Sequence, residues 1–371
     1  MNVAYVSHHK RPNYEFPWFS HMPVDKVAFI TSEPPTVGTN DPKVEYRIVG
    51  HQEKGWENRL FASTALRVFY TDFEQALEDI DVVVVLEVFS SLSRQFVAYC
   101  KAHDIPVVVL VYELIETHPI YKIPRYRGNT KYVLKHADQF VAVSQAAADH
   151  LVALGAPKDH ITVVYPGIDV HIFRPDHHKR KAHGLSFVGK LDPHKGADIM
   201  LRLYERLLAD FPDVTLNIVG NGSQKSEVVA FAKAHKGVRY IGESLPNDEL
   251  PSSILNKTSI YVLPARDTKK FGQRIGAEQF GFSIVEAMAC GLAVATTECG
   301  ALPEIVTSKN IVVPQNDEDA LYASIKTLLQ NPAKLAAVSH YNQQLAAKRY
   351  DLDRQAAAFA AVLQKVSKKG R

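Results

Sequence analysis

Cysteine is scarce in this sequence. Among 371 residues there are only three cysteines, Cys100, Cys290 and Cys299. An odd, sparse set without metal-ligand spacing cannot form a disulfide framework. The sequence therefore indicates a reducing compartment and excludes the small disulfide-stabilised secreted domains.

Long hydrophobic runs are missing as well. The longest, Val82–Leu86 and Val107–Tyr112, have the length of a strand and are too short to cross a bilayer. The first residues, MNVAYVSHHK, lack the positive flank and long apolar region of a signal peptide. We therefore expect a cytoplasmic location, and peripheral contact with the inner face of the membrane stays open as an alternative.

A large excess of charge of one sign is also absent. The net charge is +3, and the contents of 46% hydrophobic and 22% charged residues are ordinary for a soluble globular protein. This composition is far from that of a dedicated nucleic-acid binder, so nucleic acid is not an expected partner. Mild basicity suits an anionic ligand or a negatively charged membrane surface. The length is sufficient for two domains, each with its own core.

Short β-rich apolar runs alternate with amphipathic stretches, a pattern typical of βα units around a parallel sheet. The fold class predicted is therefore α/β. The expected strands of the first half are Val3–Ser7, Lys26–Thr31, Val44–Ile48, Val82–Leu86, Val107–Tyr112, Gln139–Val143 and Ile161–Val164. Those of the second half are Leu185–Val188, Thr215–Val219, Val238–Ile241, Ile260–Leu263, Ala293–Thr297 and Ile311–Val313.

The two series of strands are separated by Tyr165–Gly184, which is polar, basic and rich in turn residues. It is predicted to be a linker. Its histidines are His171, His177, His178 and His183. Because they lack regular spacing and lie beside lysines, we interpret them as solvated linker residues and not as a metal-binding tract.

A complete glycine fingerprint for a dinucleotide is missing. The sequence IVGNGS, with Gly220 and Gly222, has neither a third glycine nor the acidic residue about twenty positions on that would bind a ribose. A nicotinamide-dependent dehydrogenase is therefore disfavoured. The glycines indicate a tight turn instead.

The stretch EQFGFSIVEA contains two glutamates, Glu278 and Glu286, eight positions apart. On one helix they would be separated by about 12 Å and rotated by roughly 80°, too far to share a small ligand. Ser283 and Glu286 have the form of a capping box, which predicts a loop feeding a helix near Ser283. Two roles for Glu286 follow, closure of the capping box or contact with a ligand.

Four blocks of the chain, in order, resemble the retaining glycosyltransferases of family 4. They are His136–Pro175, Leu185–Leu207 with FVGKLDPHKG, Leu216–Ala232 with IVGNGS, and Ala277–Val306 with EQFGFSIVEA. The resemblance implies the GT-B fold, in which two Rossmann-like domains face each other across a cleft. It places an acceptor-side domain at residues 1–172, a nucleotide-sugar-binding domain at 173–350, and a C-terminal helix at 351–371 packing back toward the first domain.

The resemblance also implies how the donor is held. Glu278 would contact the hydroxyl groups of the donor sugar, and Glu286 would accept hydrogen bonds from the ribose diol. Lys190 and Lys195 would grip the diphosphate, with Lys190 standing where arginine is commoner in the family. The donor-binding residues that it implies are Gly189, Gly220, Glu243, Phe280, Gly281, Phe282, Ser283, Ile284 and Glu286.

Positive charge at the diphosphate would come from the two lysines and from the helix N-terminus that follows Gly281. No bound metal and no cofactor beyond the nucleoside-diphosphate sugar is therefore expected. The Asp-x-Asp pairs are Asp79 with Asp81 and Asp351 with Asp353. We interpret both as solvated ends of secondary-structure elements.

The acceptor side departs from the family pattern. Tyr112 and Glu113 stand where a His-Asp pair is usual, so either Glu113 contacts the acceptor or His118 takes the catalytic role of the family histidine. After the first expected strand, His9 and Lys10 belong to a basic cluster that would bind an anionic acceptor or the donor phosphate.

Further residues leave alternatives open. An amphipathic acceptor or a membrane edge is suggested by Trp18, Phe19, Tyr121, Arg125 and Arg127. The basic loop with Lys269, Lys270 and Arg274 would either close over the substrate phosphates or remain solvated.

The expected function is that of a retaining hexosyltransferase. It would move a hexose from a UDP- or GDP-sugar to a glycan, a lipid-linked acceptor or a small molecule, by metal-independent transfer on the same face of the sugar. The alternatives are a sugar-nucleotide 2-epimerase of the same fold and a non-catalytic binder of sugar nucleotides or glycans.

Overall fold

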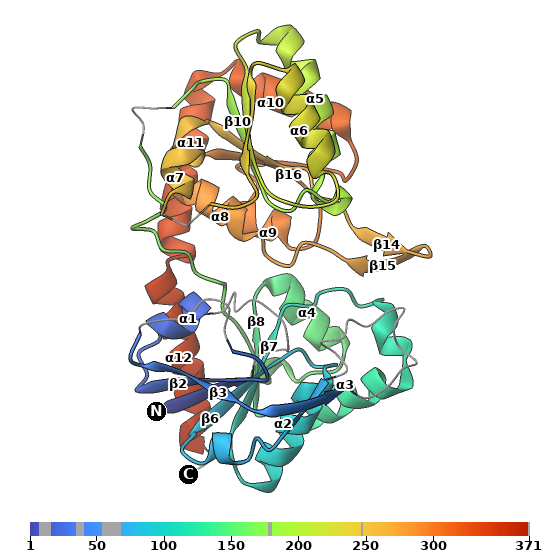
Figure 1. Ribbon diagram of the computed structural model, residues 1–371, viewed down its shortest axis with the longest axis vertical. Helices are drawn as coiled ribbons and strands as arrows, with labels where there is room; N and C mark the ends of the chain where they lie inside the picture. Colours follow the sequence, from blue (N-terminus) through green and yellow to red (C-terminus); the bar gives the residue numbers. More distant parts are fainter. Residues whose placement is uncertain (7–15, 35–40, 54–67, 177–179, 246–247, 370–371) are drawn as a thin grey trace. The chain divides into compact units, whose positions relative to one another are not determined.

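The computed structural model describes residues 1–6, 16–34, 41–53, 68–176, 180–245 and 248–369. The chain forms two compact units. Unit 1 consists of Met1–Gly167, Lys270–Ile275 and Leu352–Arg371, and unit 2 of Ile168–Lys269 and Gly276–Asp351. Each contains one parallel sheet with helices on both faces (Figure 1).

The sheet of unit 1 has seven parallel strands in the order β3-β2-β1-β6-β7-β8-β9. Their bounds are β1 Asn2–Val6, β2 Lys26–Thr31, β3 Val44–Ile48, β6 Val82–Leu86, β7 Val107–Val111, β8 Gln139–Ala142 and β9 Ile161–Val163. The central strands β6 and β7 have the sequences VVVVL and VVVLV and are buried on both faces, as expected for parallel strands covered by helices. The sheet order reverses between β1 and β6, and such switch points are where open α/β sheets bind ligands.

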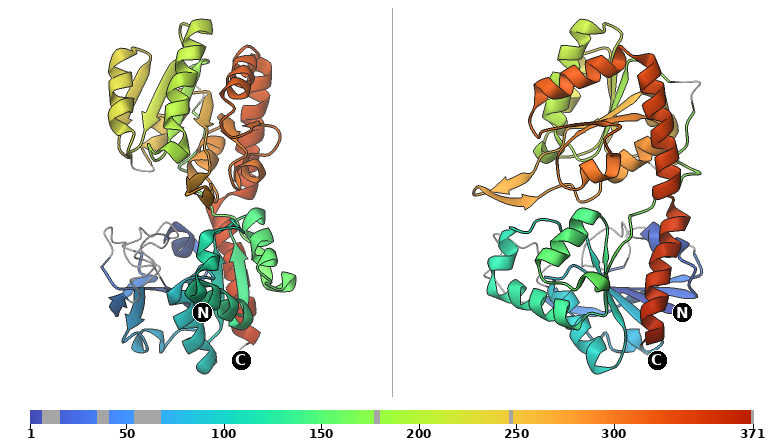
Figure 2. Two further views of the ribbon diagram at one scale, coloured as in Figure 1. Left: turned by 90° about the vertical axis from the view of Figure 1, so that its right-hand side faces the viewer. Right: turned by 180° about the vertical axis from the view of Figure 1, so that it is seen from behind.

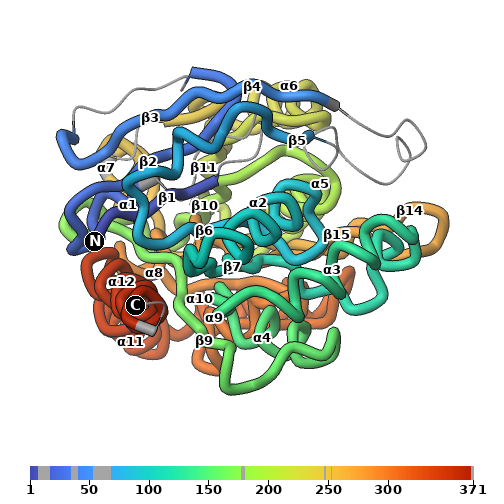
Figure 3. Tube along the Cα trace, turned by 90° about the horizontal axis from the view of Figure 1, so that it is seen from below, coloured from blue at the N-terminus to red at the C-terminus, as the bar shows by residue number. Residues whose placement is uncertain are grey.

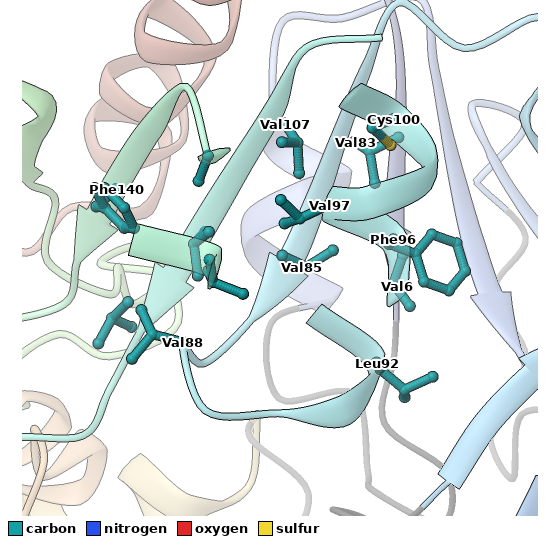
Figure 4. Packing of buried hydrophobic residues seen from close by; sticks show 14 of the residues in the cluster. Val6, Val83, Val85, Val88, Leu92, Phe96, Val97, Cys100, Val107 and Phe140 are labelled. Carbon is teal, nitrogen blue, oxygen red and sulfur yellow. The ribbon is translucent and has the colours of Figure 1, made fainter. Parts of the chain in front are cut away.

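One face of this sheet packs against helices of the first half of the chain. They are α2 Ser91–Ala102, α3 Pro124–His136 and α4 Gln145–Ala153. Figure 4 shows Phe96, Val97 and Cys100 of α2 lying among Val83 and Val85 of β6. The apolar stripe of α2 recurs at helical spacing, so a single face of the helix supplies these contacts.

The other face is covered by α1 Phe16–His21 and by the C-terminal helix α12 Leu352–Lys369, which lie side by side (Figure 3). Phe359 of α12 lies 5.1 Å from Trp18 and 5.8 Å from Phe19, measured between ring centroids. All three side chains are buried. The interpretation of Trp18 and Phe19 as residues of a membrane edge or acceptor site is therefore wrong, because they form part of the core.

The sheet of unit 2 has six parallel strands in the order β12-β11-β10-β13-β16-β17. Their bounds are β10 Gly184–Val188, β11 Thr215–Val219, β12 Val238–Gly242, β13 Ile260–Leu263, β16 Ala293–Thr297 and β17 Ile311–Val313. The helices are α5 Ala197–Asp210, α6 Lys225–Ala234, α7 Leu250–Ser253, α8 Phe282–Ala289, α9 Leu302–Val306, α10 Glu318–Leu329 and α11 Pro332–Arg349. Figure 2 shows α5 and α6 on the side of the sheet opposite to α11.

Two small antiparallel hairpins were not expected from the sequence. The first joins β4 Gly50–Glu53 to β5 Val68–Thr71. The second joins β14 Thr268–Lys270 to β15 Gln273–Gly276 and replaces the basic loop predicted there. Strand β4 and both strands of the second hairpin are short and polar, so they lack the apolar alternation that predicts a strand, whereas β5 buries Val68 and Tyr70 but is only four residues long.

Within the part of the chain that the structure describes, no helix combines the length and apolarity needed to cross a membrane.

Candidate functional site

A cavity of about 580 Å³ lies at the carboxyl ends of three neighbouring strands in unit 2. The first residues after these strands, Gly189 after β10, Gly220 after β11 and Glu243 after β12, all line it. Lys190 and Glu286 also line the cavity. Five of the residues implied by the resemblance, from four separate segments of the chain, therefore share one wall.

Glycine is required where two of these strand ends meet. A Cβ atom at Gly220 would lie 1.8 Å from the carbonyl oxygen of Gly189, and one at Gly222 would lie 2.5 Å from that of Leu191. The turns are tied together where the backbone N–H of Leu191 donates to the carbonyl oxygen of Asn221 at 2.9 Å. The glycines thus allow two backbones to pack without side chains between them, which leaves main-chain groups at the cavity wall.

The polar side chains of the wall differ in how they are engaged. Asp192 accepts hydrogen bonds from the backbone N–H and the hydroxyl of Ser223, which lower the pKa of its carboxyl group. Glu243 forms an ion pair with Lys225 and accepts a hydrogen bond from Asn221 at 2.9 Å. Lys190 is exposed and, within the described residues, forms no ion pair. Its ammonium group can therefore bind an anion without first breaking a contact.

Glu286 lies in α8 and is partly buried at the cavity wall. Burial raises the pKa of its carboxyl group from 4.5 to about 7. A carboxylate that is desolvated in this way gains from hydroxyl donors that a ligand brings.

The helix start expected near Ser283 occurs, but the alternative in which Ser283 and Glu286 form a capping box is wrong. Helix α8 begins at Phe282, its N-cap is Gly281 in the left-handed conformation with φ +87°, and no side chain caps it. Ser283 therefore stands inside the first turn, where its Oγ lies 2.7 Å from the hydroxyl of Tyr261. Because Glu286 does not close the helix, its carboxylate is available to the cavity.

Beside this helix start, Glu278 forms an ion pair with Lys195, which ends the short turn before α5. The Glu278 side chain is buried, whereas that of Lys195 is about one-fifth exposed. The backbone of Glu278 is fixed by Ala301, whose N–H donates to its carbonyl oxygen at 2.8 Å. Gly300 is needed there because a Cβ would lie 2.0 Å from the same oxygen.

Three of the residues implied for donor binding have limited access through their side chains. Phe280 and Ile284 are buried, and the Phe280 ring packs 5.7 Å from that of Tyr350. The Phe282 ring packs 5.1 Å from that of Phe280. What the helix start presents is mainly its free N–H groups, which carry partial positive charge.

In unit 1 the side chains of Glu113 and His118 contact backbone groups, and the Nε2 of His118 lies 3.2 Å from the carbonyl oxygen of Ile275 on β15. Glu113 is buried, and its Oε1 accepts hydrogen bonds from the backbone N–H groups of Leu114 and Ile115 at 2.9 and 2.8 Å. His118 caps a short 3₁₀ helix, with its Nδ1 accepting from the N–H of Ile120 at 3.1 Å. His9 and Lys10 lie outside the described residues.

Sequence reasoning missed Glu87, the residue directly after β6. It is 6% exposed and has φ +67°, a backbone conformation that is uncommon for a residue other than glycine. Its Oε1 accepts hydrogen bonds from the N–H groups of Tyr112 and Glu113 at 2.9 and 3.1 Å. Glu87 therefore holds the segment that carries Glu113. An acid placed immediately after a run of five apolar residues was the available signal.

Among the described residues, no group of three or more histidine, cysteine, aspartate or glutamate side chains is arranged to hold a metal ion. Positive charge at the cavity comes from Lys190 in its wall and from Lys225, which pairs with Glu243, and Lys195 pairs with Glu278 beside the start of α8.

Comparison with protein-family models gives two adjoining matches. The model described as Glycosyltransferase Family 4 matches residues 25–172, and the model described as Glycosyl transferases group 1 matches residues 171–345. The match therefore extends over both units.

Two curated proteins illustrate the sequence similarity. The D-inositol 3-phosphate glycosyltransferase of Thermobispora bispora is 29% identical over 229 residues, 56% of this chain and 51% of that protein. The GDP-mannose-dependent alpha-(1-6)-phosphatidylinositol monomannoside mannosyltransferase of Mycolicibacterium smegmatis is 26% identical over 230 residues, 58% of this chain and 59% of that protein. The chain thus spans about half the length of the curated relatives it matches.

Solved structures resemble the whole chain. Anabaena HepE in complex with UDP has a TM-score of 0.74 at 15% identity and covers 100% of this chain and 99% of its own. The sucrose-phosphate synthase of Thermosynechococcus elongatus has a TM-score of 0.74 at 16% identity, with 100% of both chains covered. At these identities the similarity establishes the fold.

Proposed function

Because the chain belongs to the family 4-type glycosyltransferases of the GT-B fold, we propose that it transfers a hexose from a nucleoside-diphosphate sugar with retention of configuration. The observation that carries the proposal is the cavity in unit 2, where Lys190 and Glu286 share one wall beside the start of α8. A cation, a desolvated carboxylate and a helix N-terminus match the diphosphate and ribose of such a donor.

The donor would bind with its nucleotide along the cavity. The carboxylate of Glu286 accepts hydrogen bonds from the two ribose hydroxyl groups, which compensates for its burial. The free N–H groups at the start of α8 and the ammonium of Lys190 bind the diphosphate. The exposed edge at Glu243 lies beside the base, where main-chain contacts dominate.

The leaving group is stabilised by positive charge. As the bond between the anomeric carbon and the phosphate oxygen breaks, Lys195 can donate to the diphosphate with one proton while keeping another on Glu278, since an ammonium has three donors. The acceptor oxygen bonds to the same face of the anomeric carbon, and its proton passes to the departing phosphate. No metal is required in this scheme, so transfer should persist in EDTA.

UDP- and GDP-sugars are the donors proposed first, because Anabaena HepE is bound to UDP and the M. smegmatis relative uses GDP-mannose by name. The acceptor proposed is a glycan, a lipid-linked sugar or a small polyol; the T. bispora relative is named for D-inositol 3-phosphate. The protein would act in the cytoplasm.

The test is thermal unfolding with a panel of UDP-, GDP- and ADP-sugars, followed by assay of the released nucleoside diphosphate and of a new glycoside. A donor at about 100 times its Kd should stabilise the native protein by about 2.7 kcal/mol. An epimerised sugar nucleotide without a glycoside would assign the protein to the 2-epimerases. Stabilisation without hydrolysis or transfer across the panel would make it a binder.

A further inference from the structure

A second cavity of unit 2 lies away from the donor cavity. It has a volume of about 840 Å³ and is lined by the edge strand β17 and by helices α10 and α11. Ser308 and Lys309, which precede β17, belong to its wall, so the second cavity lies at the amino end of that strand. The donor cavity lies at the carboxyl ends of its strands, and the two cavities share no lining residue.

The charged side chains of the second cavity have one sign. Lys309 and Lys334 line it from two segments of the chain, and both are exposed and form no ion pair among the described residues. None of the lining residues is acidic, and the sequence has no aspartate or glutamate between Asp319 and Asp351. The two ammonium groups can therefore bind an anion without first releasing a carboxylate.

Hydroxyl groups supply most of the remaining polar wall. They belong to Ser308, Ser324, Thr327 and Tyr341. The hydroxyl groups of Ser308 and Ser324 form no hydrogen bond within the described ranges. Thr327 donates to the carbonyl oxygen of Ala323 at 2.8 Å, which leaves its own oxygen as an acceptor. Because a hydroxyl group can both donate and accept, these side chains match the hydroxyl groups of a polyol.

The turn that carries Ser308 and Lys309 is held in an uncommon backbone conformation. Thr307 has φ +61° and ψ 169°, a region that is occupied almost only by glycine. Its Oγ1 lies 3.0 Å from the hydroxyl of Tyr341, which ties the turn to α11. Strain of this kind is retained where the position of neighbouring side chains matters, and here the neighbours are the serine and the lysine of the cavity wall.

Apolar side chains complete the wall of the second cavity. Leu328 and Val338 are buried, and Ile311 is half-buried. A volume of about 840 Å³ falls in the range of roughly 300–1,000 Å³ that is typical of small-molecule sites. A concave, largely apolar wall with a few polar groups therefore fits a small ligand.

We propose that the second cavity binds a phosphorylated polyol such as a sugar phosphate, with the phosphate bound by Lys309 and Lys334 and the polyol by the hydroxyl side chains. Each ammonium offers three donors to phosphate oxygens. The apolar part of the wall can pack against the CH groups of a sugar ring. Because the donor cavity is separate, both ligands can be bound at once, and the proposal does not depend on the proposed function.

The experiment is calorimetric titration of the full chain with glucose 6-phosphate, and with glucose and inorganic phosphate as partial ligands. Two variants change the second cavity. One combines Lys309→Gln with Lys334→Gln, and the other, Ala337→Trp, places a large ring in the cavity from an exposed position of α11. The matched controls are Lys348→Gln and Ala347→Trp, because both residues are exposed on the same helix and do not line the cavity.

The wild type should bind glucose 6-phosphate more tightly than inorganic phosphate, and glucose least. The double lysine variant and Ala337→Trp should each weaken binding of glucose 6-phosphate at least about tenfold. The two matched controls should bind like the wild type. Lys190→Ala should also retain this binding, because Lys190 lies in the donor cavity. Melting temperatures should stay close to that of the wild type, since every substituted residue is exposed.

Several results would overturn the proposal. Absence of glucose 6-phosphate binding by the wild type is one, and unchanged binding by the double lysine variant is another. Loss of binding in Lys190→Ala alone would assign the ligand to the donor cavity, and an equal loss in the matched controls would contradict the assignment to the second cavity. Equal affinity for inorganic phosphate would exclude a role for the hydroxyl groups. Binding in the second cavity by a protein without glycosyl transfer would support this site and refute the proposed function.

Discussion

Lys195 and Glu278 are 83 positions apart in the chain, yet their side chains form an ion pair beside the start of α8. The carboxylate is buried, and the ammonium is partly exposed. Breaking such a pair from one side leaves a charge with little solvent and no partner. Each residue of the pair therefore contributes to the stability of the fold as well as to the proposed reaction.

Replacing either residue should abolish function without unfolding the protein. We expect Glu278→Gln and Lys195→Ala each to lower glycosyl transfer by about 10²-fold or more, because each removes a group that acts on the sugar or the leaving phosphate. Release of nucleoside diphosphate is the measurement, and circular dichroism checks the fold. Turnover like that of the wild type in either variant would refute the site assignment.

The same pair should show non-additive stability. Lys195→Ala is expected to lower the free energy of unfolding by about 1–3 kcal/mol, because it leaves the buried carboxylate of Glu278 without its cation. In the double variant with Glu278→Gln this cost should fall by more than about 0.5 kcal/mol. Urea unfolding of the wild type, the two single variants and the double variant completes a double-mutant cycle. If the changes in the free energy of unfolding were strictly additive, the two charges would not interact in solution.

Glu286 predicts a pH dependence with a defined sign. Its folded-state pKa of about 7 exceeds the ordinary value of 4.5, so the folded protein binds this proton more tightly than the unfolded chain does. The resulting stabilisation is complete below the ordinary value and is lost as the pH rises through about 7. Thermal unfolding across this range should show the wild type losing stability relative to Glu286→Gln as the pH rises.

Donor binding should have the opposite trend. An ionised Glu286 accepts both hydrogen bonds from a ribose diol, so affinity for the donor nucleotide should increase as the pH rises through about 7. Glu286→Gln should bind more weakly and without this dependence. Calorimetric titration with UDP and GDP checks the trend, and a parallel pH profile in the variant would assign the titration to another group.

Gly220 provides a steric test. Gly220→Ala places a Cβ 1.8 Å from the carbonyl oxygen of Gly189, so the two strand-end turns must separate. We expect the free energy of unfolding to fall by at least about 2 kcal/mol. We also expect donor binding to be lost. The matched control is Gly128→Ala in α3, where a Cβ meets nothing within 4 Å and should stabilise the helix by about 1 kcal/mol.

Glu87 provides a test in unit 1. Glu87→Ala removes the acceptor for two backbone N–H groups and is expected to cost about 1–3 kcal/mol. Glu87→Gln keeps a side-chain oxygen of the same reach and should recover part of that loss. If urea unfolding found the two variants equally stable, the hydrogen bonds to Tyr112 and Glu113 would contribute nothing.

Most strands of the two sheets could be predicted from the sequence because each is an apolar run bounded by turn residues. The expected strands from Lys26–Thr31 to Ile311–Val313 all occur, with bounds shifted by a residue or two. Buried parallel strands are hydrophobic on both faces, so the signal does not depend on distant partners.

The errors concern features that depend on residues far away in the sequence. Ser283 fits a capping box locally, but its hydroxyl contacts Tyr261, 22 residues away, and the left-handed Gly281 starts the helix instead. In the sequence Trp18 resembles an aromatic residue of a membrane interface, but in the structure Phe359 of α12 packs against it. The ion pair of Lys195 with Glu278 could be placed only through a family resemblance, since no spacing rule joins residues so far apart.

Helix α12 has a consequence for biosynthesis. Its residues Leu352, Phe359 and Leu363 complete one side of a core whose other members, such as Val3 and Tyr5, are translated first. Unit 2 lies entirely between these segments. On the ribosome, the second unit can thus fold while the first still exposes an apolar sheet face, reversing the usual N-to-C order of domain completion. A nascent chain stalled before α12 should accordingly recruit chaperones at its N-terminal unit.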